Sequence, residues 1–544
     1  MSRSHESFVG HAWTVTLFTL LSRIVGLLRD GVISAVLGTS GIASSFVTAL
    51  IVPNVFRRLF GEGALSAAFI PEYTKLSDTD RREAGRYASV VMAMLLVTLG
   101  SIVVVAEVVL FVLLEFAGGG SNGRGDFLTL TMIMLPYMPL VCATAIAGGM
   151  LQAHGKFVPH AAAPVLLNVC MIVAALVWAY VLDASMRATA VAVAVAVVGA
   201  GVVQLGWCVW SMRREAYWTR RFGEARGRAW DTVKRMGPAA IGLGALQVST
   251  LFDALLAGWP VMVGATIAGY AFPMDDGSAA TLYYAQRLYQ FPLGVFGIAI
   301  ATAIFPLLSR CAGSAEDFAQ VLRRGVRLSL FIGIPAAAGL VLVRDDLVGA
   351  VYLRGKFDAE DVPRVGMALA CFAPAVWAYA LTHVLTRAFY AKGDTVTPMR
   401  MGLATVGCNI TLNLVLMWFL RESGLALATA ITAMMQSVVL MMIAGRRFRD
   451  GGAILDRATA RGIGASVLSA AVMALAIWGV RQMWEGGGGD WRGHARSLGV
   501  DVAVGLAVYL GIAVVWKRAE WRMLIGGLTR RGGDVKDSAA DTPE

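Results

Sequence analysis

Apolar runs of about 20 residues recur along the whole 544-residue chain, separated by short polar turns and basic clusters. A helix of this length crosses the hydrocarbon core of a bilayer. A helix also pairs its own backbone polar groups, as lipid requires. The pattern predicts an all-α polytopic membrane protein with about 14 transmembrane helices. We expect these helices to begin near residues 11, 41, 88, 127, 160, 188, 236, 279, 328, 364, 399, 424, 462 and 498.

The composition excludes a soluble protein. The chain is 57% hydrophobic and only 15% charged, whereas soluble domains are about 25% charged. Six cysteines and six histidines are scattered without CxxC or HExxH spacing, which disfavours a metal enzyme. The first apolar run contains Arg23 and lacks a following cleavage site, so we interpret it as a retained helix and not a signal peptide.

Basic residues predict the orientation, because positively charged loops stay on the cytoplasmic side. Alternate connecting segments separate into a set with 31 of the 47 Lys and Arg residues and a set with ten. The richer set includes both chain ends, so we expect both termini in the cytoplasm. The net charge of +11 is then a topological signal with some attraction to anionic membrane lipids, and no nucleic-acid partner is expected.

Six arginines remain inside or at the ends of the predicted spans. A charge in mid-bilayer costs at least about 2.5 kcal/mol, so each needs a partner, a water-filled cavity or an interface. Five of the six belong to the first, second and eighth spans. The set comprises Arg23, Arg29, Arg57, Arg58, Arg287 and Arg387.

Two pairs of segments indicate an internal repeat. The segment AHGKFVP at 153–159 is echoed by AKGDTVTP at 391–398, and each is followed by an asparagine, Asn168 or Asn409. A weaker echo links the segments ending at Pro71 and Pro306; the two offsets are 238 and 235 residues. Six spans in each half predict two six-helix lobes related as parallel repeats, with a site between them, as in alternating-access transporters. Coincidence among short Gly/Pro motifs is the other interpretation.

The repeat sets the expected domains. The N-terminal six-helix lobe covers 1–228 and the C-terminal lobe covers 229–450. Two additional transmembrane helices at 451–531 form either an apolar groove or a structural annex. A polar, disordered cytoplasmic tail is expected at 532–544.

The chemistry of the charged spans favours anion binding. Arginine's planar fork suits phosphate oxygens, so several arginines in one cavity fit a pyrophosphate. Arg23, Arg29 and Arg287 are the strongest candidates. Arg57 and Arg58 are weaker, because Glu62 lies one turn from Arg58 and is a structural partner for it. The other interpretation is that some arginines reach the interface or lock helices together through Asp30 and Glu62.

Oxygen-bearing side chains in the membrane indicate a second site. Asp253 is a deep carboxylate, and Asn409 and Asn413 lie one turn apart. With Thr429 they form either an oxygen-rich cation site or a hydrogen bond that locks helices.

Five segments resemble the signature motifs of the MurJ (MviN-type) lipid II flippases, in the MOP transporter superfamily. The resemblance covers nearly all of the first twelve spans, and the second motif is highly specific. The segments are SRIVGLLRD at 22–30, VPNVFRRLFGEGALSAAFIP at 52–71, RMGP at 235–238, LYYAQRLYQFPLGVFGIAIATAIFP at 282–306 and RAFYAKGDTVTP at 387–398.

The resemblance implies a non-enzymatic flippase in the bacterial inner membrane. Its substrate is lipid II, the undecaprenyl-pyrophosphate-linked peptidoglycan precursor, and cell-wall synthesis proteins are potential partners. The implied substrate-binding positions are Arg23, Arg29, Arg57 or Arg58, and Arg287, with Glu62 as the accompanying acid. The resemblance also implies a sodium site of Asp253, Asn409, Asn413 and Thr429, and a groove for the polyprenyl tail in the last two spans.

The chain departs from the family pattern at Ser44, Gln286 and Gln290, where relatives often carry acids. The cavity is therefore more positive than usual, which affects any coupling step that uses those acids. Two further hypotheses stay open. One is an exporter of drugs or other polyprenyl-linked glycans. The other is a polyprenyl-phosphate glycosyltransferase or ligase that uses the external acids Asp345, Asp346, Asp358, Glu360 and Asp361.

Overall fold

The computed structural model describes residues 2–59, 65–116, 123–215, 217–219, 222–223, 225–483 and 489–516. Within these ranges, the side chains of residues 2–13, 65–67 and 235–246 are not described. Helices make up most of the described chain, as expected for a protein in lipid. The strands of the described chain form one hairpin, with two residues in each strand. The predicted tail at 532–544 lies outside the described residues.

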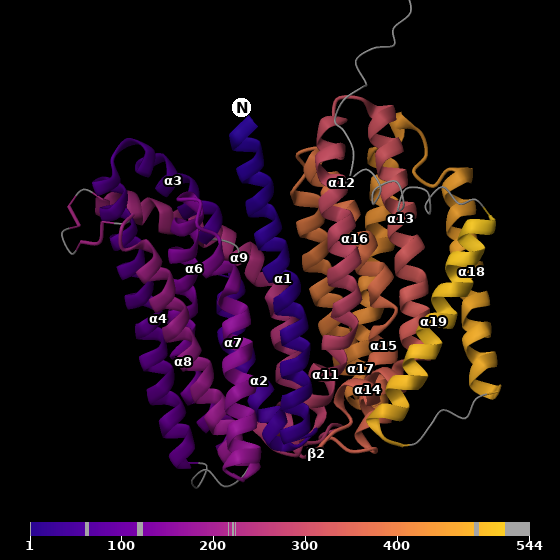
Figure 1. Cartoon of the computed structure of the whole chain (residues 1–544), viewed down its shortest axis with the longest axis horizontal. Helices are drawn as coiled ribbons and strands as arrows, with labels where there is room; N and C mark the ends of the chain where they lie inside the picture. Colours follow the sequence, from indigo (N-terminus) through magenta and orange to yellow (C-terminus); the bar gives the residue numbers. More distant parts are fainter. Residues whose placement is uncertain are drawn as a thin grey trace, which may run out of the picture. The chain divides into compact units, whose positions relative to one another are not determined.

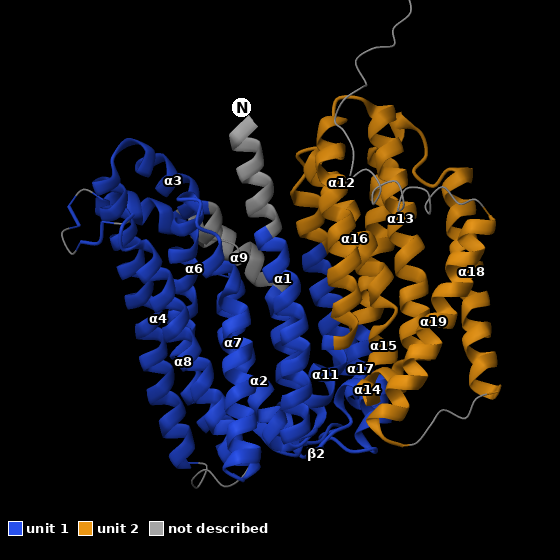
Figure 2. Ribbon diagram, in the orientation of Figure 1, with its two compact units in different colours: residues 1–287, 351–368, 402–428 blue, residues 288–350, 369–401, 429–544 orange. Residues whose placement is uncertain are grey.

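Contacts divide the chain into two compact units (Figure 2). Unit 1 comprises residues 1–287, 351–368 and 402–428, and unit 2 comprises 288–350, 369–401 and 429–544. The unit boundaries fall inside helices α11, α14, α15 and α17, whose bounds follow below. The two units differ from the sequence halves that the repeat predicts, so the six-helix lobes remain a prediction.

Unit 1 contains the N-terminal helices, and α7 packs between α1 and α8 (Figure 1). Its elements are α1 (Ser2–Leu37), α2 (Gly41–Phe56), α3 (Leu65–Thr79), α4 (Arg81–Phe116), α5 (Gly123–Met134), α6 (Tyr137–Ala153), α7 (Val158–Leu176), the π-helical turn η2 (Val177–Val181), α8 (Met186–Met212), α9 (Ala225–Ala257), α10 (Trp259–Met262), β1 (Thr266–Ile267), β2 (Tyr270–Ala271) and most of α11 (Ser278–Pro292).

Unit 2 contains most of the remaining helices, and α13 packs against both α16 and α18. Its elements, including those shared with unit 1, are the π-helical turn η3 (Leu293–Gly297), α12 (Ile298–Arg310), α13 (Ala315–Leu342), α14 (Arg344–Tyr352), α15 (Asp361–Phe372), α16 (Ala375–Ala391), α17 (Val396–Arg447), the 3₁₀ turn η4 (Arg449–Gly451), α18 (Arg457–Met483) and α19 (Trp491–Val515).

Eleven helical stretches in the described part of the chain are long and apolar enough to cross a membrane. Each of the fourteen expected starting positions falls inside a helix, which confirms the predicted fold class. The count of fourteen is not confirmed. The charged helices α1 and α9 lie outside the eleven, and α17 joins the two spans expected at residues 399 and 424.

The break within α17 lies at Arg421, whose φ of 53° and ψ of −136° are not helical. A positive φ is unfavourable for a residue with a Cβ, so neighbouring contacts must hold it. Nε of Arg421 donates to the carbonyl oxygen of Pro273 (3.0 Å), and its Nη2 donates to Asp275 Oδ2 (2.9 Å). These bonds tie the break to the loop before α11.

Small residues let the helices approach closely within each unit. A Cβ added at Gly201 of α8 would lie 2.7 Å from the ring of Tyr137 on α6. In unit 2, a Cβ at Gly333 of α13 would lie 2.8 Å from the backbone of Trp377 on α16. Such contacts are typical of membrane helices, where packing replaces the hydrophobic effect as the source of association.

Candidate functional site

Five side chains from α1, α7 and α11 meet inside unit 1, and we call them the arginine cluster. The members are Arg29, Asp30, Asn168, Tyr283 and Arg287. Arg29 and Asp30 are adjacent on α1 and are only 8% and 3% exposed. Tyr283 and Arg287 lie one turn apart on α11, so both side chains point to the same side of that helix.

Arg29 uses all three of its nitrogens in this cluster. Nε and Nη2 donate to the same oxygen of Asp30, at 2.9 and 2.6 Å. Nη1 donates to Asn168 Oδ1 at 2.8 Å, and Nη2 also reaches the Tyr283 hydroxyl at 3.0 Å. Arg29 therefore fixes α7 and α11 against α1.

Arg287 is held less completely. Its Nη2 donates to the Tyr283 hydroxyl at 3.1 Å, and its Nε lies 3.5 Å from Asp30 Oδ2. That Nε is buried and has no hydrogen-bond acceptor among the described residues. The side chain is 33% exposed, against 10% for Arg29. Arg287 is therefore the member of the cluster that retains donors for a ligand.

The arginine cluster carries two positive charges and one negative charge. A buried guanidinium without an anion would be strongly unfavourable. The carboxylate of Asp30 therefore makes the burial of the two guanidiniums tolerable. One positive charge stays uncompensated within the cluster. This arrangement suits an anion, and Arg287, whose side chain is the more exposed of the two arginines, suits contact with a phosphate oxygen.

Arg23 lies six residues before Arg29 on α1, about 9 Å along the helix axis. Its side chain is half-buried, and it has no ion pair or hydrogen bond with any described residue. The structure therefore does not bring Arg23 into the arginine cluster, although Arg23 and Arg29 belong to the same helix.

The arginines of the second predicted span do not join the arginine cluster through any described contact. Arg57 is half-buried near Tyr137 and Cys142 of α6. Arg58 is exposed, and its Nη1 donates to Gln247 of α9 at 3.3 Å. Glu62 lies outside the described residues, so its predicted pairing with Arg58 is untested. Arg387 lies in unit 2, with its guanidinium 5.3 Å from the ring centre of Phe305.

Ser44, one of the positions where we expect a departure from the family pattern, has a structural role here. The residue is fully buried on α2, and its Oγ accepts a hydrogen bond from the backbone N–H of Ala280 at 3.2 Å. This N–H belongs to the first turn of α11, where helix N–H groups lack intrahelical partners. Gln286 and Gln290 are half-buried on the same helix.

Three of the four predicted cation ligands meet in unit 1. Nδ2 of Asn413 donates to Asp253 Oδ1 and, at 3.1 Å, to Asn409 Oδ1. The Ser249 hydroxyl also donates to Asn409 Oδ1, at 2.7 Å. Oδ1 of Asn413 is buried and has no hydrogen-bond donor among the described residues. The fourth residue, Thr429, belongs to unit 2. Elsewhere too, no three His, Cys, Asp or Glu side chains of the described chain group as a metal site.

Carboxylates of unit 1 also form an ion-pair network with Arg364. Arg364 donates from Nε to Glu422 Oε1 at 2.6 Å and from Nη2 to Asp275 Oδ1. Burial alone would raise the pKa of Asp275, but the hydrogen bond and charge of Arg364 outweigh it and lower the pKa below its ordinary value. Asp361 accepts a hydrogen bond from Thr39.

In unit 2, Asp346 pairs with Arg481 and lies 3.0 Å from His494 Nδ1. Asp346 and Asp361 thus have structural partners and are not free catalytic acids.

The sequence analysis did not identify Tyr283 or Asn168 as site residues, and it treated Asp30 only as a helix lock. The sequence contained a signal for each of the two missed residues. Tyr283 precedes Arg287 by one helical turn, and Asn168 follows the repeat motif. Asn409, its counterpart in the repeat, is also buried and accepts a hydrogen bond from a neighbouring helix, as Asn168 does.

Comparisons with known proteins agree with the resemblance of the motifs. Residues 33–490 match the family model described as "Lipid II flippase MurJ". The chain is 32% identical over 533 residues to "Probable lipid II flippase MurJ" of Rhizobium tropici, which covers 95% of this chain and 96% of the relative.

Several solved structures share the fold. "Lipid II flippase MurJ, inward closed conformation" has a TM-score of 0.75 and 20% identity, and it covers 94% of this chain and 99% of that one. A multidrug resistance MATE family transporter of the MOP superfamily, in an inward-facing conformation, has a TM-score of 0.64 and 14% identity. That similarity covers 79% of this chain and 95% of the transporter.

Proposed function

The chain belongs to the lipid II flippase MurJ family, and from this we propose that it moves lipid II from the cytoplasmic to the periplasmic leaflet of the bacterial inner membrane. Lipid II joins an undecaprenyl chain through a pyrophosphate to the peptidoglycan precursor. The family is one of multi-pass membrane transporters, so the chain is a transporter and not an enzyme. The hypothesis of a glycosyltransferase is set aside.

The observation that carries this proposal is the uncompensated positive charge of the arginine cluster within membrane helices. Arg287 supplies a buried Nε without an acceptor among the described residues, and Arg29 holds the cluster together. A pyrophosphate would occupy donors that Asp30 leaves free, and Arg23 supplies a further donor on α1. The substrate then crosses by alternating access, while its polyprenyl tail stays in lipid along a groove built by α18 and α19.

Depletion of the gene in its own bacterium tests the proposal. We expect lipid II to accumulate on the cytoplasmic face, and a plasmid copy of the wild-type chain to restore its transfer and growth. Normal transfer of lipid II after depletion would contradict the proposed function. Binding of purified protein to lipid II, compared with an undecaprenyl-linked O-antigen unit, tests the substrate directly.

A second candidate is export of drugs or of another polyprenyl-linked glycan, and the fold shared with a MATE transporter favours it. Drug substrates of such exporters are usually cations. The positive arginine cluster would repel a cation, so we favour the anionic lipid. Stronger binding of a cationic drug than of lipid II would reverse this order.

A sodium ion is the proposed coupling ligand. Asp253 supplies a carboxylate, and Oδ1 of Asn413 is a buried acceptor without a described donor, which suits a hard cation. Asn409 and Thr429 would complete the ligand set. We expect sodium, but not potassium, to raise the unfolding temperature, and Asp253→Asn to abolish that rise. An equal effect of both salts would contradict the sodium site.

Both termini are proposed to lie in the cytoplasm, on the strength of the basic loops. Reporter fusions at the C-terminus that are active only in the cytoplasm would test this orientation. Proteins of cell-wall synthesis that use lipid II are the proposed partners, since they consume the substrate that the flippase delivers.

A further inference from the structure

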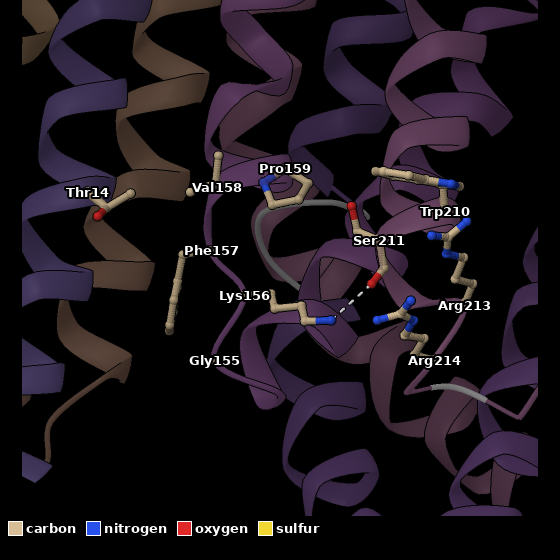
Figure 3. A pocket seen from close by; sticks show the side chains of 10 residues that line it. All are labelled: Thr14, Gly155, Lys156, Phe157, Val158, Pro159, Trp210, Ser211, Arg213 and Arg214. Carbon is tan, nitrogen blue, oxygen red and sulfur yellow. Dashed lines mark hydrogen bonds between the residues drawn. The ribbon is translucent and has the colours of Figure 1, made fainter.

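A second concentration of positive charge lies in unit 1, away from the arginine cluster, and we call it the basic pocket. It is a cavity of about 510 Å³ lined by Lys156, Arg213, Arg214, Trp210 and Phe157, among others (Figure 3). Ligand sites typically measure about 300–1,000 Å³, so a small headgroup fits. The pocket lies where α6 ends, α7 begins and α8 ends.

The charges of the basic pocket are only partly compensated. Lys156 Nζ donates to the carbonyl oxygen of Ser211 and pairs with Glu215 Oε1, both at 3.2 Å. No described carboxylate pairs with Arg213 or Arg214. Figure 3 shows the ends of Lys156 and Arg214 pointing into the same part of the pocket. Like charges that converge in this way favour an anion between them.

Two features prepare the pocket for an anion. The guanidinium of Arg213 lies 4.6 Å from the ring centre of Trp210, so cation–π stacking limits its mobility. Helix α7 begins at the pocket. Pro159 in its first turn has no N–H, and the N-cap residue Phe157 provides no side-chain acceptor for the other N–H groups of that turn. The partial positive charge of a helix N-terminus therefore adds to that of the three basic side chains.

The surroundings of the pocket indicate that the anion belongs to a lipid. Exposed apolar residues of α8 recur at Val195, Val202 and Val203, and this row ends at Trp210, which is 60% exposed. In a membrane helix such a row faces acyl chains, and a tryptophan marks the level of the headgroups. A phospholipid with its chains along this row would place its phosphate beside Arg213 and Arg214.

We propose that the basic pocket binds the phosphate headgroup of an anionic phospholipid, distinct from the lipid that is transported. The shared chemistry is a phosphate ester, and the apolar row on α8 selects a lipid over a free phosphate. The bound lipid joins α7 to α8 at the end where their polar loops meet the membrane surface.

Native mass spectrometry of the purified full chain tests the proposal, with phosphatidylglycerol and phosphatidylcholine as probes. We expect wild type to retain phosphatidylglycerol at least tenfold more tightly than phosphatidylcholine. Arg213→Gln with Arg214→Gln should remove most of this preference. The matched control is Arg82→Gln with Arg226→Gln, which removes two exposed arginines from loop-proximal helix starts in the same unit. The control should stay within about twofold of wild type.

Three results would overturn the proposal. The first is phosphatidylglycerol binding that the Arg213 and Arg214 double variant leaves unchanged. The second is an equal loss in the control, which would indicate unspecific charge. The third is release of the lipid by millimolar inorganic phosphate, which would indicate a soluble ligand. Should the double variant fail to fold, the single variant Arg214→Gln replaces it, with an expected loss of about threefold, and an unchanged affinity in that variant would equally contradict the site.

Discussion

The arginine cluster and the basic pocket are both positive, both lie in unit 1, and differ in how their charges are accommodated. In the arginine cluster, Arg29 is buried, and Asp30, Asn168 and Tyr283 satisfy it. In the basic pocket, Arg213 and Arg214 are exposed, and an aromatic ring replaces the carboxylate. A guanidinium in the membrane interior needs a counter-charge to be stable, whereas one at the surface keeps its charge available.

The largest effect should follow from breaking the arginine cluster. Arg29→Ala leaves Asp30 buried without its main cation, so we expect a loss of about 3–5 kcal/mol in the free energy of unfolding. The variant should also fail to support growth. Denaturant unfolding of purified protein, with complementation of a depleted strain, measures both.

A double variant is the matched control for this prediction. Arg29→Ala with Asp30→Ala removes the buried carboxylate together with its main cation and should recover part of the lost stability. The recovery should be incomplete, because Arg287 also loses its pairing with Asp30. If the double variant is as unstable as Arg29→Ala, the buried carboxylate is not the cause.

Arg287→Ala should separate binding from stability. Arg287 is one-third exposed and incompletely hydrogen-bonded, so its removal should cost less stability than removal of Arg29. We expect the Kd for lipid II to rise at least about tenfold, or roughly 1.4 kcal/mol. The control is Arg387→Ala, an intramembrane arginine outside the arginine cluster, which should change the Kd less than about twofold. Equal effects of the two variants would contradict the assignment.

Salt should weaken lipid binding at the basic pocket and should have little effect on the stability of the arginine cluster. Raising the ionic strength from about 0.1 to 1 M shortens the Debye length from about 10 to 3 Å. We expect phosphatidylglycerol to bind the exposed basic pocket about fivefold more weakly in high salt. The stability difference between wild type and Arg29→Ala should change little, since those charges are buried. Equal salt sensitivity in the two measurements would remove the distinction between the regions.

The smallest expected effect concerns Glu215. Its hydrogen bond from Lys156 lowers the pKa of the carboxyl below the ordinary 4.5. The ionised form therefore holds Lys156 above that pH, and the interaction is lost as the pH falls through the lowered pKa. Glu215→Gln removes the competing carboxylate and should strengthen phosphatidylglycerol binding about two- to threefold at pH 7.

A pH titration below 4.5 completes this test. Wild type should approach the affinity of Glu215→Gln there, while the variant stays constant. Unchanged or weaker binding in Glu215→Gln would show that this carboxylate does not compete with the lipid for Lys156.

The sequence indicated the membrane helices well, because a span is a local property of about 20 apolar residues. Every expected start lies in a helix. It was less informative about how the spans are joined. Arg421 interrupts α17 for a single residue and is held by Pro273 and Asp275, almost 150 positions earlier in the chain. No local pattern contains that contact.

The sequence by itself indicated which cations fall within the predicted spans, since a charge within an apolar run is visible without any fold. Only the tertiary structure decided which of them are free. Arg29 is satisfied by Asn168 and Tyr283, which lie 139 and 254 positions away, while Arg287 keeps a buried donor without an acceptor among the described residues. The physical reason is that hydrogen bonds of a few ångströms depend on helix packing, and packing joins residues whose separation in the chain carries no signal of their contact.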